Sequence, residues 1–266
     1  MHRTSARPET RGRALWVFIT GASSGLGAAF ARHYAAQGAT LGLVARRGDL
    51  LDALARSLPA PSFVYPLDVT DAAALAAAGT DFIGRAGVPD IVIANAGVSV
   101  GTLTEEAGDL AVFERVLRTN VVGMANTFSP FVAAMRGAGR GRLAGIASVA
   151  GIRGLPGAGA YSASKAAAIN YLESLRVELH GSGVKVVTLA PGYIATPMTV
   201  ANPYTMPFIL PAAEAARRMA RAIAAGRSYA VVPWQMAVVA KLMRLLPNAL
   251  FDRLFVHAGR KPRGPG

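Results

Sequence analysis

Near its start the chain reads Thr20-Gly21-Ala22-Ser23-Ser24-Gly25-Leu26-Gly27, between an apolar run and a segment of helical periodicity. Glycine allows a sharp turn, and it lets backbone N–H groups approach a phosphate without a Cβ in the way. The N-terminus of the following helix adds unpaired N–H donors and the positive end of its dipole. The turn therefore predicts a site for a dinucleotide pyrophosphate, although a tight strand–helix connection would use the same residues.

Outward from this turn, short apolar runs alternate with longer helical patterns. The runs predict strands at Ala14–Ile19, Thr40–Ala45, Ser62–Pro66, Asp90–Ala94, Arg142–Ser148, Val184–Ala190 and Tyr229–Pro233. The patterns predict helices at Gly25–Gln37, Asp49–Leu58, Asp71–Arg85, Leu110–Met135 with an interruption at Pro130, Tyr161–Leu179 and Pro211–Ala225. Continuous apolar strands are typical of a parallel sheet covered on both faces. We expect an α/β fold, with a doubly wound, mostly parallel seven-stranded sheet in a single domain.

The charge is concentrated at the ends of the chain. The net charge is +13, but residues 1–14 hold four arginines against one glutamate, and residues 241–266 hold six basic residues against one aspartate. Solvated basic tails explain this better than a nucleic-acid surface, so we expect no nucleic-acid partner. We expect a flexible basic N-terminus at residues 1–13, a catalytic domain at 14–233, and an amphipathic extension with a basic tail at 234–266.

Composition removes several classes of protein. Of the 266 residues, 52% are hydrophobic and 16% charged, and none is cysteine. Disulfides and cysteine-ligated metals are excluded, and we expect no metal site. We see no secretory signal, and no apolar run reaches the roughly 18 residues of a membrane-spanning helix. A cytoplasmic location is expected, with membrane association through residues 234–266 as an alternative.

The end of the second strand indicates which dinucleotide binds. An acidic residue about 20 positions past the glycines binds the ribose hydroxyls in NAD enzymes. Here Ala45 holds that position, and Arg46 and Arg47 follow. A guanidinium pairs well with phosphate, so these residues favour NADP(H), unless the arginines merely begin a solvated helix.

Tyr161 and Lys165 lie four residues apart, on one face of a predicted helix. Free tyrosine titrates near a pKa of about 10, and a neighbouring ammonium favours the phenolate. Lys165 is therefore expected to lower the pKa of Tyr161 and make it a usable proton donor and acceptor. By itself the spacing also occurs by chance in surface packing.

Two further polar residues strengthen the chemical interpretation. Ser148 ends the fifth predicted strand, where its hydroxyl could donate to a substrate carbonyl, or simply cap the strand. Asn120 lies inside a predicted helix, where asparagine is mildly unfavourable. It is either holding a water molecule or exposed to solvent.

Taken together, these motifs resemble the short-chain dehydrogenase/reductase family over Ala14–Pro233. The matching segments are TGASSGLG at Thr20–Gly27, LDVTD at Leu67–Asp71, NAG at Asn95–Gly97, Asn120, Ser148, YSASK at Tyr161–Lys165 and PGYIATPM at Pro191–Met198. The resemblance implies a Rossmann-like fold and hydride transfer between nicotinamide and an alcohol or ketone, as a homodimer or homotetramer.

The resemblance also implies residue roles. The catalytic residues would be Asn120, Ser148, Tyr161 and Lys165, with Asn120 holding a water that relays protons to Lys165, which also binds the nicotinamide ribose. The cofactor-binding residues would be Thr20, Gly21, Ser23, Ser24, Gly25, Leu26, Gly27, Arg46, Arg47, Asp68, Val69, Asn95, Ala96, Gly97, Tyr161, Lys165, Pro191, Gly192, Ile194 and Thr196. Among these, Asp68 and Val69 would contact adenine.

For two apolar segments, the sequence does not decide what they pack against. Tyr193–Leu210 is expected to form a substrate lid whose apolar side chains contact an apolar substrate or pack on the core. Residues 234–256 have apolar side chains between basic ones. We expect them to pack on the catalytic domain, on another subunit or on a membrane interface. The alternatives to an enzyme are an NADP-binding regulatory module and a peripheral lipid-handling protein.

Overall fold

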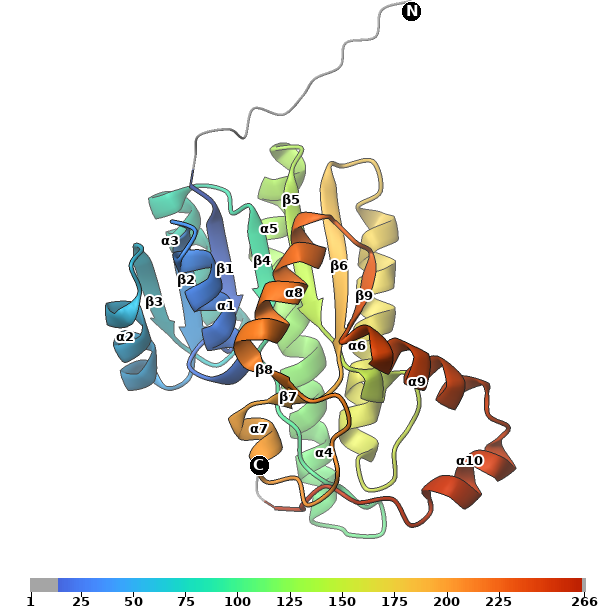
Figure 1. Ribbon diagram of the computed structural model, residues 1–266. Helices are drawn as coiled ribbons and strands as arrows, with labels where there is room; N and C mark the ends of the chain where they lie inside the picture. Colours follow the sequence, from blue (N-terminus) through green and yellow to red (C-terminus); the bar gives the residue numbers. More distant parts are fainter. Residues whose placement is uncertain (1–13, 265–266) are drawn as a thin grey trace, which may run out of the picture.

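The computed structural model describes residues 14–264, and the expected flexible segment at residues 1–13 lies outside them. Seven parallel strands form one sheet in the order β3-β2-β1-β4-β5-β6-β9 (Figure 1). Their bounds are β1 (Trp16–Thr20), β2 (Thr40–Ala45), β3 (Ser62–Pro66), β4 (Ile91–Ala94), β5 (Gly141–Ile146), β6 (Val184–Pro191) and β9 (Tyr229–Val232). The order reverses between β1 and β4, which is the place where doubly wound sheets bind ligands.

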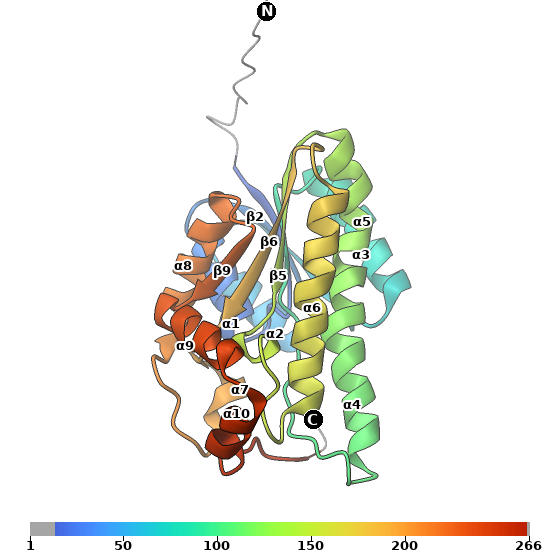
Figure 2. The same ribbon diagram turned by 90° about the vertical axis from the view of Figure 1, so that its right-hand side faces the viewer.

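Helices cover both faces of the sheet (Figure 2). One layer holds α1 (Gly25–Ala35), α2 (Gly48–Ser57) and α8 (Ala212–Ala224); the other holds α3 (Ala72–Ala86), α5 (Gly123–Gly137) and α6 (Gly159–Glu178). Each layer has its own apolar core, one around Phe30 and Met219 and the other around Phe18, Phe82 and Phe131. This burial on two faces explains the continuous apolar strands, and the predicted fold class is confirmed.

The long helix predicted over Leu110–Met135 is interrupted, but not at Pro130. The structure has α4 (Asp109–Leu117), the π-helical turn η1 (Arg118–Val122) and then α5, with Pro130 inside α5. Pro130 fits there because α3 approaches with Gly79, where a Cβ would lie 2.5 Å from the proline Cβ. The irregularity falls at Asn120, and π-type turns are frequent at functional sites.

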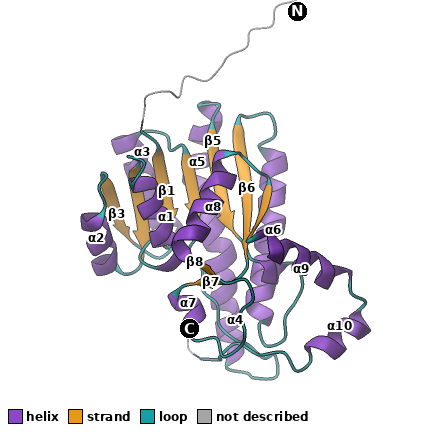
Figure 3. Cartoon of the chain, in the orientation of Figure 1, coloured by secondary structure: helices purple, strands orange, loops and turns teal. Residues whose placement is uncertain are grey.

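The carboxyl ends of the strands carry the loops that build the site (Figure 3). After β5 comes the short 3-10 turn η2 (Val149–Gly151), so Ser148 lies beyond the strand rather than in it. After β6 come β7 (Ile194–Ala195), α7 (Pro197–Val200) and β8 (Leu210–Pro211), in which β7 pairs with β8. The chain closes with α9 (Trp234–Leu245) and α10 (Asn248–Phe255). None of the helices within residues 14–264 is long and apolar enough to cross a bilayer.

Candidate active site

One large cavity, of about 820 Å³, opens at the carboxyl edge of the sheet. It brings together most of the predicted site residues from segments far apart in the sequence. Those that line it are Gly21, Ser23, Ser24, Gly25, Leu26, Arg46, Arg47, Asp68, Val69, Asn95, Ala96, Gly97, Ser148, Tyr161, Lys165, Pro191, Gly192, Ile194 and Thr196. The sequence-predicted residues Thr20, Gly27 and Asn120 lie behind this wall.

Thr20 and Gly27 shape the wall from behind. The fully buried Thr20 hydroxyl accepts hydrogen bonds from the backbone N–H groups of Asn95 and Ala96, at 3.2 and 3.3 Å, which ties β1 to the loop after β4. A Cβ on Gly27 would lie 2.1 Å from the carbonyl oxygen of Gly21, so only glycine lets α1 start this close to the turn. Both residues support the cavity without lining it.

The glycine turn leaves backbone donors open to the cavity. Gly21 and Gly25 have φ values of +68° and +55°, which favour glycine. Ser24 is the N-cap of α1, yet its side chain makes no capping hydrogen bond, and the first turn of α1 holds no acidic residue. The N–H groups of that turn therefore have no side-chain acceptor, and they fit an anionic phosphate.

Two arginines lie at the end of β2. The Ala45 side chain offers no carboxylate to a ribose. The Arg47 guanidinium donates to the hydroxyls of Ser23 and Ser24, at 3.1 and 3.0 Å. Arg46 makes one loose ion pair, 3.8 Å from the Asp68 carboxylate, and its side chain is 69% exposed. Removing Arg46 from Asp68 therefore costs little, and the guanidinium is free to contact a bound ligand.

The floor of the nucleotide end is held by hydrogen bonds of the strand-end loops. The Asn95 side-chain amide donates to the carbonyl oxygens of Thr20 and Gly21, at 3.0 and 3.3 Å. The Asp68 carboxylate accepts from the backbone N–H and the hydroxyl of Thr70, both at 2.9 Å. Val69 is buried beside Gly123, where a Cβ would lie 2.6 Å from its side chain. These bonds fix the floor of the cavity.

Asn120 is fully buried in η1, and its side chain bonds to protein groups. Its amide nitrogen donates to the Val98 carbonyl and the Ser164 hydroxyl, both at 2.9 Å, and its oxygen accepts from the Val98 N–H at 2.8 Å. The expected alternative of an exposed helix residue is therefore wrong. Gly97 lies beside the Asn120 oxygen and Lys165, since a Cβ there would be 3.1 Å from that oxygen and 3.6 Å from the ammonium.

Tyr161, Ser148 and Lys165 meet between α6 and the end of β5. The Ser148 hydroxyl caps η2 by accepting from the Ala150 N–H at 3.2 Å, and it also hydrogen-bonds Tyr161. The Lys165 ammonium donates to the Ile146 carbonyl at 2.7 Å and lies 5.8 Å from the centre of the Tyr161 ring. A tyrosine hydroxyl and a serine hydroxyl thus face one point of the cavity, beside a buried ammonium.

The electrostatics differ from the expectation that Lys165 lowers the pKa of Tyr161. Burial raises the pKa of the Tyr161 phenol, and the hydrogen bond from Ser148 opposes that shift. Burial also lowers the pKa of Lys165 to about 8, because loss of solvent disfavours the charged ammonium. Because burial raises the pKa of Tyr161 above its usual value, the phenol keeps its proton at neutral pH.

The segment after β6 closes the cavity opposite Tyr161. Gly192 is packed against Met236 of α9, whose Cγ would lie 2.6 Å from a Cβ at that position. Ile194 is buried, and the Thr196 side chain lies over the glycine turn, 3.3 Å from where a Cβ of Gly25 would be. The strand end and the turn therefore face each other across the nucleotide end of the cavity.

In the expected lid and at the end of the chain, some side chains line the cavity and others are exposed to solvent. Within the expected lid, Met198 and Tyr204 line the cavity, whereas Val200 is 83% exposed. Sequence reasoning missed four residues of the C-terminal segment that also line it, Phe255, Ala258, Gly259 and Lys261. Nothing in the sequence signals this, because a lysine in an arginine-rich tail has the pattern of a solvated end.

Known proteins resemble this chain over most of its length. The family described as short chain dehydrogenase matches residues 15–206. An uncharacterized oxidoreductase of Myxococcus xanthus is 40% identical over 237 residues, 88% of this chain and 93% of that protein. The 2-dehydro-3-deoxy-L-rhamnonate dehydrogenase (NAD(+)) of a Sphingomonas strain is 38% identical over 180 residues, 68% of this chain and 72% of that protein. An alcohol dehydrogenase from the archaeon Thermococcus sibiricus, solved with 5-hydroxy-NADP, has a TM-score of 0.72 at 25% identity, covering 82% of this chain and 95% of that one.

Proposed function

Because this chain belongs to the short-chain dehydrogenase/reductase family of oxidoreductases, we propose that it transfers a hydride between NADP(H) and a secondary alcohol or ketone. The observation that carries the proposal is the convergence of Tyr161, Ser148 and Lys165 at one end of a cavity whose other end is the glycine turn. Hydride transfer requires the nucleotide and the substrate to bind in one cavity, with the phosphates at the glycine turn and the carbonyl at Tyr161.

The residues of the nucleotide end fit a dinucleotide with a 2′-phosphate. The open N–H groups at the start of α1 would hold the pyrophosphate, and Arg46 would pair with the 2′-phosphate. Two of the three similar proteins named above differ in cofactor: the Sphingomonas enzyme is named for NAD(+), and the Thermococcus structure holds an NADP derivative. The choice for this chain therefore rests on Ala45, which lacks a carboxylate, and on the cations that follow it.

The proposed chemistry assigns the proton to Tyr161. When bound, the nicotinamide supplies or accepts the hydride. Since burial raises the pKa of Tyr161, its hydroxyl is protonated at neutral pH and can donate to the oxygen of a ketone. Ser148 donates a second hydrogen bond to the same oxygen and holds it in place. Lys165 would orient a ribose hydroxyl of the cofactor, and Asn120 would hold a water that relays protons to Lys165.

The substrate end favours an apolar body. Leu155, Met198, Tyr204 and Phe255 contribute to its wall. Such side chains exclude water from the reacting carbon and contact a hydrocarbon group of the substrate. A substrate with an aryl or alkyl body beside its carbonyl fits this wall.

The exposed apolar face of α9 and α10 supports the proposal of a homo-oligomer. Trp234, Leu242, Leu245 and Leu254 are each at least 60% exposed. Isolated apolar side chains are normal on a surface, but a set on two consecutive helices is characteristic of an interface. A second subunit is the occupant that we propose, and lipid binding is the other outcome of the test given below.

A substrate panel tests the function as a whole. Purified protein would be assayed with NADPH and NADH against aryl ketones, acyl ketones, steroids and small diketones, following nucleotide absorbance. We expect turnover of at least one apolar ketone, with NADPH preferred, and none by the matched Tyr161→Phe variant. Nucleotide binding without turnover of any ketone or alcohol would favour the regulatory alternative instead.

A further inference from the structure

The chain after α10 returns to the active-site cavity, and we call residues 256–264 the C-terminal strap. Figure 1 shows this segment running back from α10 toward α4 and α7. Ala258, Gly259 and Lys261 of the strap line the cavity together with Phe255 at the end of α10. The end of the described chain is therefore part of the substrate wall.

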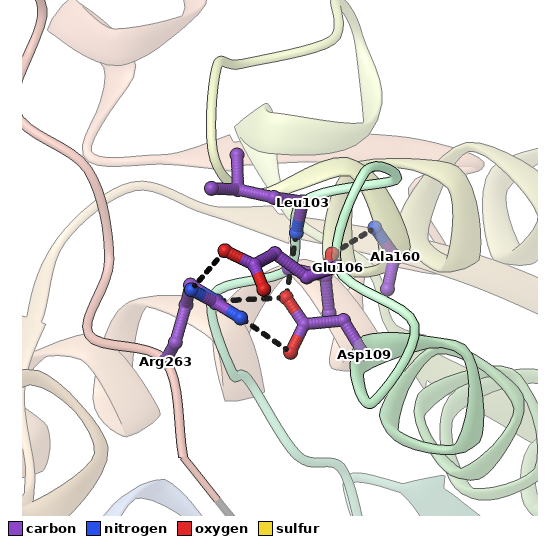
Figure 4. A network of polar contacts seen from close by, with 6 residues as sticks. Leu103, Glu106, Asp109, Ala160 and Arg263 are labelled. Carbon is purple, nitrogen blue, oxygen red and sulfur yellow. Dashed lines mark hydrogen bonds and ion pairs between the residues drawn. The ribbon is translucent and has the colours of Figure 1, made fainter.

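A partly exposed cluster of ion pairs anchors the C-terminal strap (Figure 4). The Arg263 guanidinium bonds to the Asp109 carboxylate and to the Glu106 carboxylate, both at 2.9 Å. Asp109 is only 8% exposed, and it also accepts from the Leu103 N–H at 2.8 Å. These two donors lower the pKa of Asp109, so its charge is held at neutral pH. The anchor lies two residues beyond Lys261 and limits where that lysine can be.

The backbone of the strap is also docked. The Gly101 N–H donates to the Pro262 carbonyl at 2.9 Å, and a Cβ on Gly101 would lie 2.3 Å from the Lys261 carbonyl oxygen. A Cβ on Gly157 would lie 2.9 Å from the Cβ of Arg260. Two loops thus use glycine to let the strap lie against them, and this close packing fixes the lysine between its neighbours.

Lys261 is a cation in the substrate end of the cavity with no acid to pair with. Its ammonium lies 5.2 Å from the centre of the Tyr161 ring. No hydrogen bond or ion pair joins it to any group within residues 14–264, and burial lowers its pKa to about 8. The one acidic residue among those lining the cavity is Asp68, which faces Arg46 at the nucleotide end. A half-buried charge of this kind is stabilised when an anion binds beside it.

We propose that Lys261 selects substrates that carry a carboxylate close to the reacting carbonyl. The inference rests on the proposed function, because it takes the carbonyl to sit at the Tyr161 hydroxyl. The Lys261 ammonium lies over the ring that carries this hydroxyl, so a carboxylate close to the carbonyl would come within its reach, and the apolar wall would receive the rest of the body. The substrate class is therefore keto acids and hydroxy acids with an apolar body, and Lys261 is a specificity-determining residue rather than a proton donor.

Comparing each keto acid with its amide separates the effect of the substrate's charge from the effect of its shape. The probes are 2-oxo-4-phenylbutanoate and 4-oxo-4-phenylbutanoate, which differ in the distance between ketone and carboxylate, and their two primary amides. The proteins are the full-length chain, Lys261→Gln, Lys261→Arg and the control Lys241→Gln. The control removes an exposed lysine of α9, which is not among the residues that line the cavity.

The expected result is a loss confined to the acids. For at least one keto acid, kcat/KM should fall by about tenfold to a hundredfold in Lys261→Gln, through KM more than kcat, since a charge-assisted hydrogen bond is lost. The amides should change less than twofold, Lys261→Arg should keep most of the preference, and Lys241→Gln should match the unmodified protein. Equal losses on acid and amide would mean that Lys261 acts on Tyr161 or on the strap, and would overturn the proposal.

A binding arm separates this proposal from the proposed function. Binding of 4-phenylbutanoate and 4-phenylbutanamide, which have no ketone, is measured by calorimetry on the protein with and without NADP⁺. Tighter binding of the carboxylate that disappears in Lys261→Gln supports anion selection even in a protein that reduces no ketone. Equal binding of both probes, together with turnover of neutral ketones, leaves the proposed function intact and refutes the role of Lys261.

Discussion

Arg46→Ala is predicted to weaken NADPH binding while leaving NADH binding nearly unchanged. The Arg46 guanidinium has only a loose contact to Asp68, at 3.8 Å, so removing it breaks little in the free protein. Arg47 is already occupied by the hydroxyls of the glycine turn. The loss therefore reports the contact of Arg46 with the extra phosphate and little else.

The size of the effect follows from the exposure of the arginine. A hydrogen bond to a charged group contributes about 1.5–3 kcal/mol, and solvent reduces this at an exposed site. With a side chain 69% exposed, we expect about 1–2 kcal/mol, which is about a fivefold to thirtyfold rise in the Kd of NADPH. Adding Ala45→Asp places a carboxylate at the end of β2, so the double variant should shift the NADPH/NADH preference by roughly a hundredfold.

The assay is a fluorescence titration of each reduced nucleotide into each variant. The matched control is Arg56→Ala, which removes an exposed arginine from α2, away from the cavity, and tests for a general effect of net charge. The assignment of Arg46 is refuted if the unmodified protein binds both nucleotides equally, or if Arg46→Ala and Arg56→Ala raise the Kd of NADPH alike.

The remaining predictions concern stability and assembly. Gly27→Ala should destabilise the fold by about 1–3 kcal/mol in urea, because its Cβ would lie 2.1 Å from a carbonyl oxygen, whereas Gly84→Ala, with no atom within 4 Å, should not; equal effects would contradict this. The pKa of Lys165 is lowered to about 8 by folding, so the unfolded chain binds more protons above that pH, and the unfolding free energy should rise from pH 8 to 10 relative to Lys165→Met. Parallel pH curves of the two proteins would be evidence against that shift. Leu245→Glu together with Leu242→Glu should lower the mass in size exclusion with light scattering; an unchanged mass with lost liposome binding would assign this face to lipid.

The fold and the nucleotide end could be predicted because local sequence determines them. Continuous apolar strands indicate a sheet covered on both faces. The turn at Thr20–Gly27 requires glycine because of its backbone conformation alone. The sequence predicts the helix interruption at Pro130, but the irregular turn lies at Asn120, because Gly79 on another helix leaves room for the proline ring. Tertiary contacts of this kind leave no local pattern.

The electrostatics of the site and its substrate end depend on burial, which the sequence does not encode locally. The spacing of Tyr161 and Lys165 suggests a lowered tyrosine pKa, yet both groups lose solvent on folding and the shift goes the other way. Lys261 lies in the cavity because the strap around it is held by Asp109 and by the backbone of Gly101, both far away in the chain. The residues next to it in the sequence predict only another solvated basic residue of the tail.

The central claim, that Tyr161 transfers the proton, is tested most directly by the single-turnover rate of Tyr161→Phe on a ketone that the unmodified protein reduces with NADPH. The variant removes one hydroxyl and keeps the ring. We expect a rate lower by roughly 10²–10⁴-fold, with a Kd for NADPH within about twofold of the unmodified value. A variant that keeps more than about a tenth of the rate would contradict the role of Tyr161 as the proton donor.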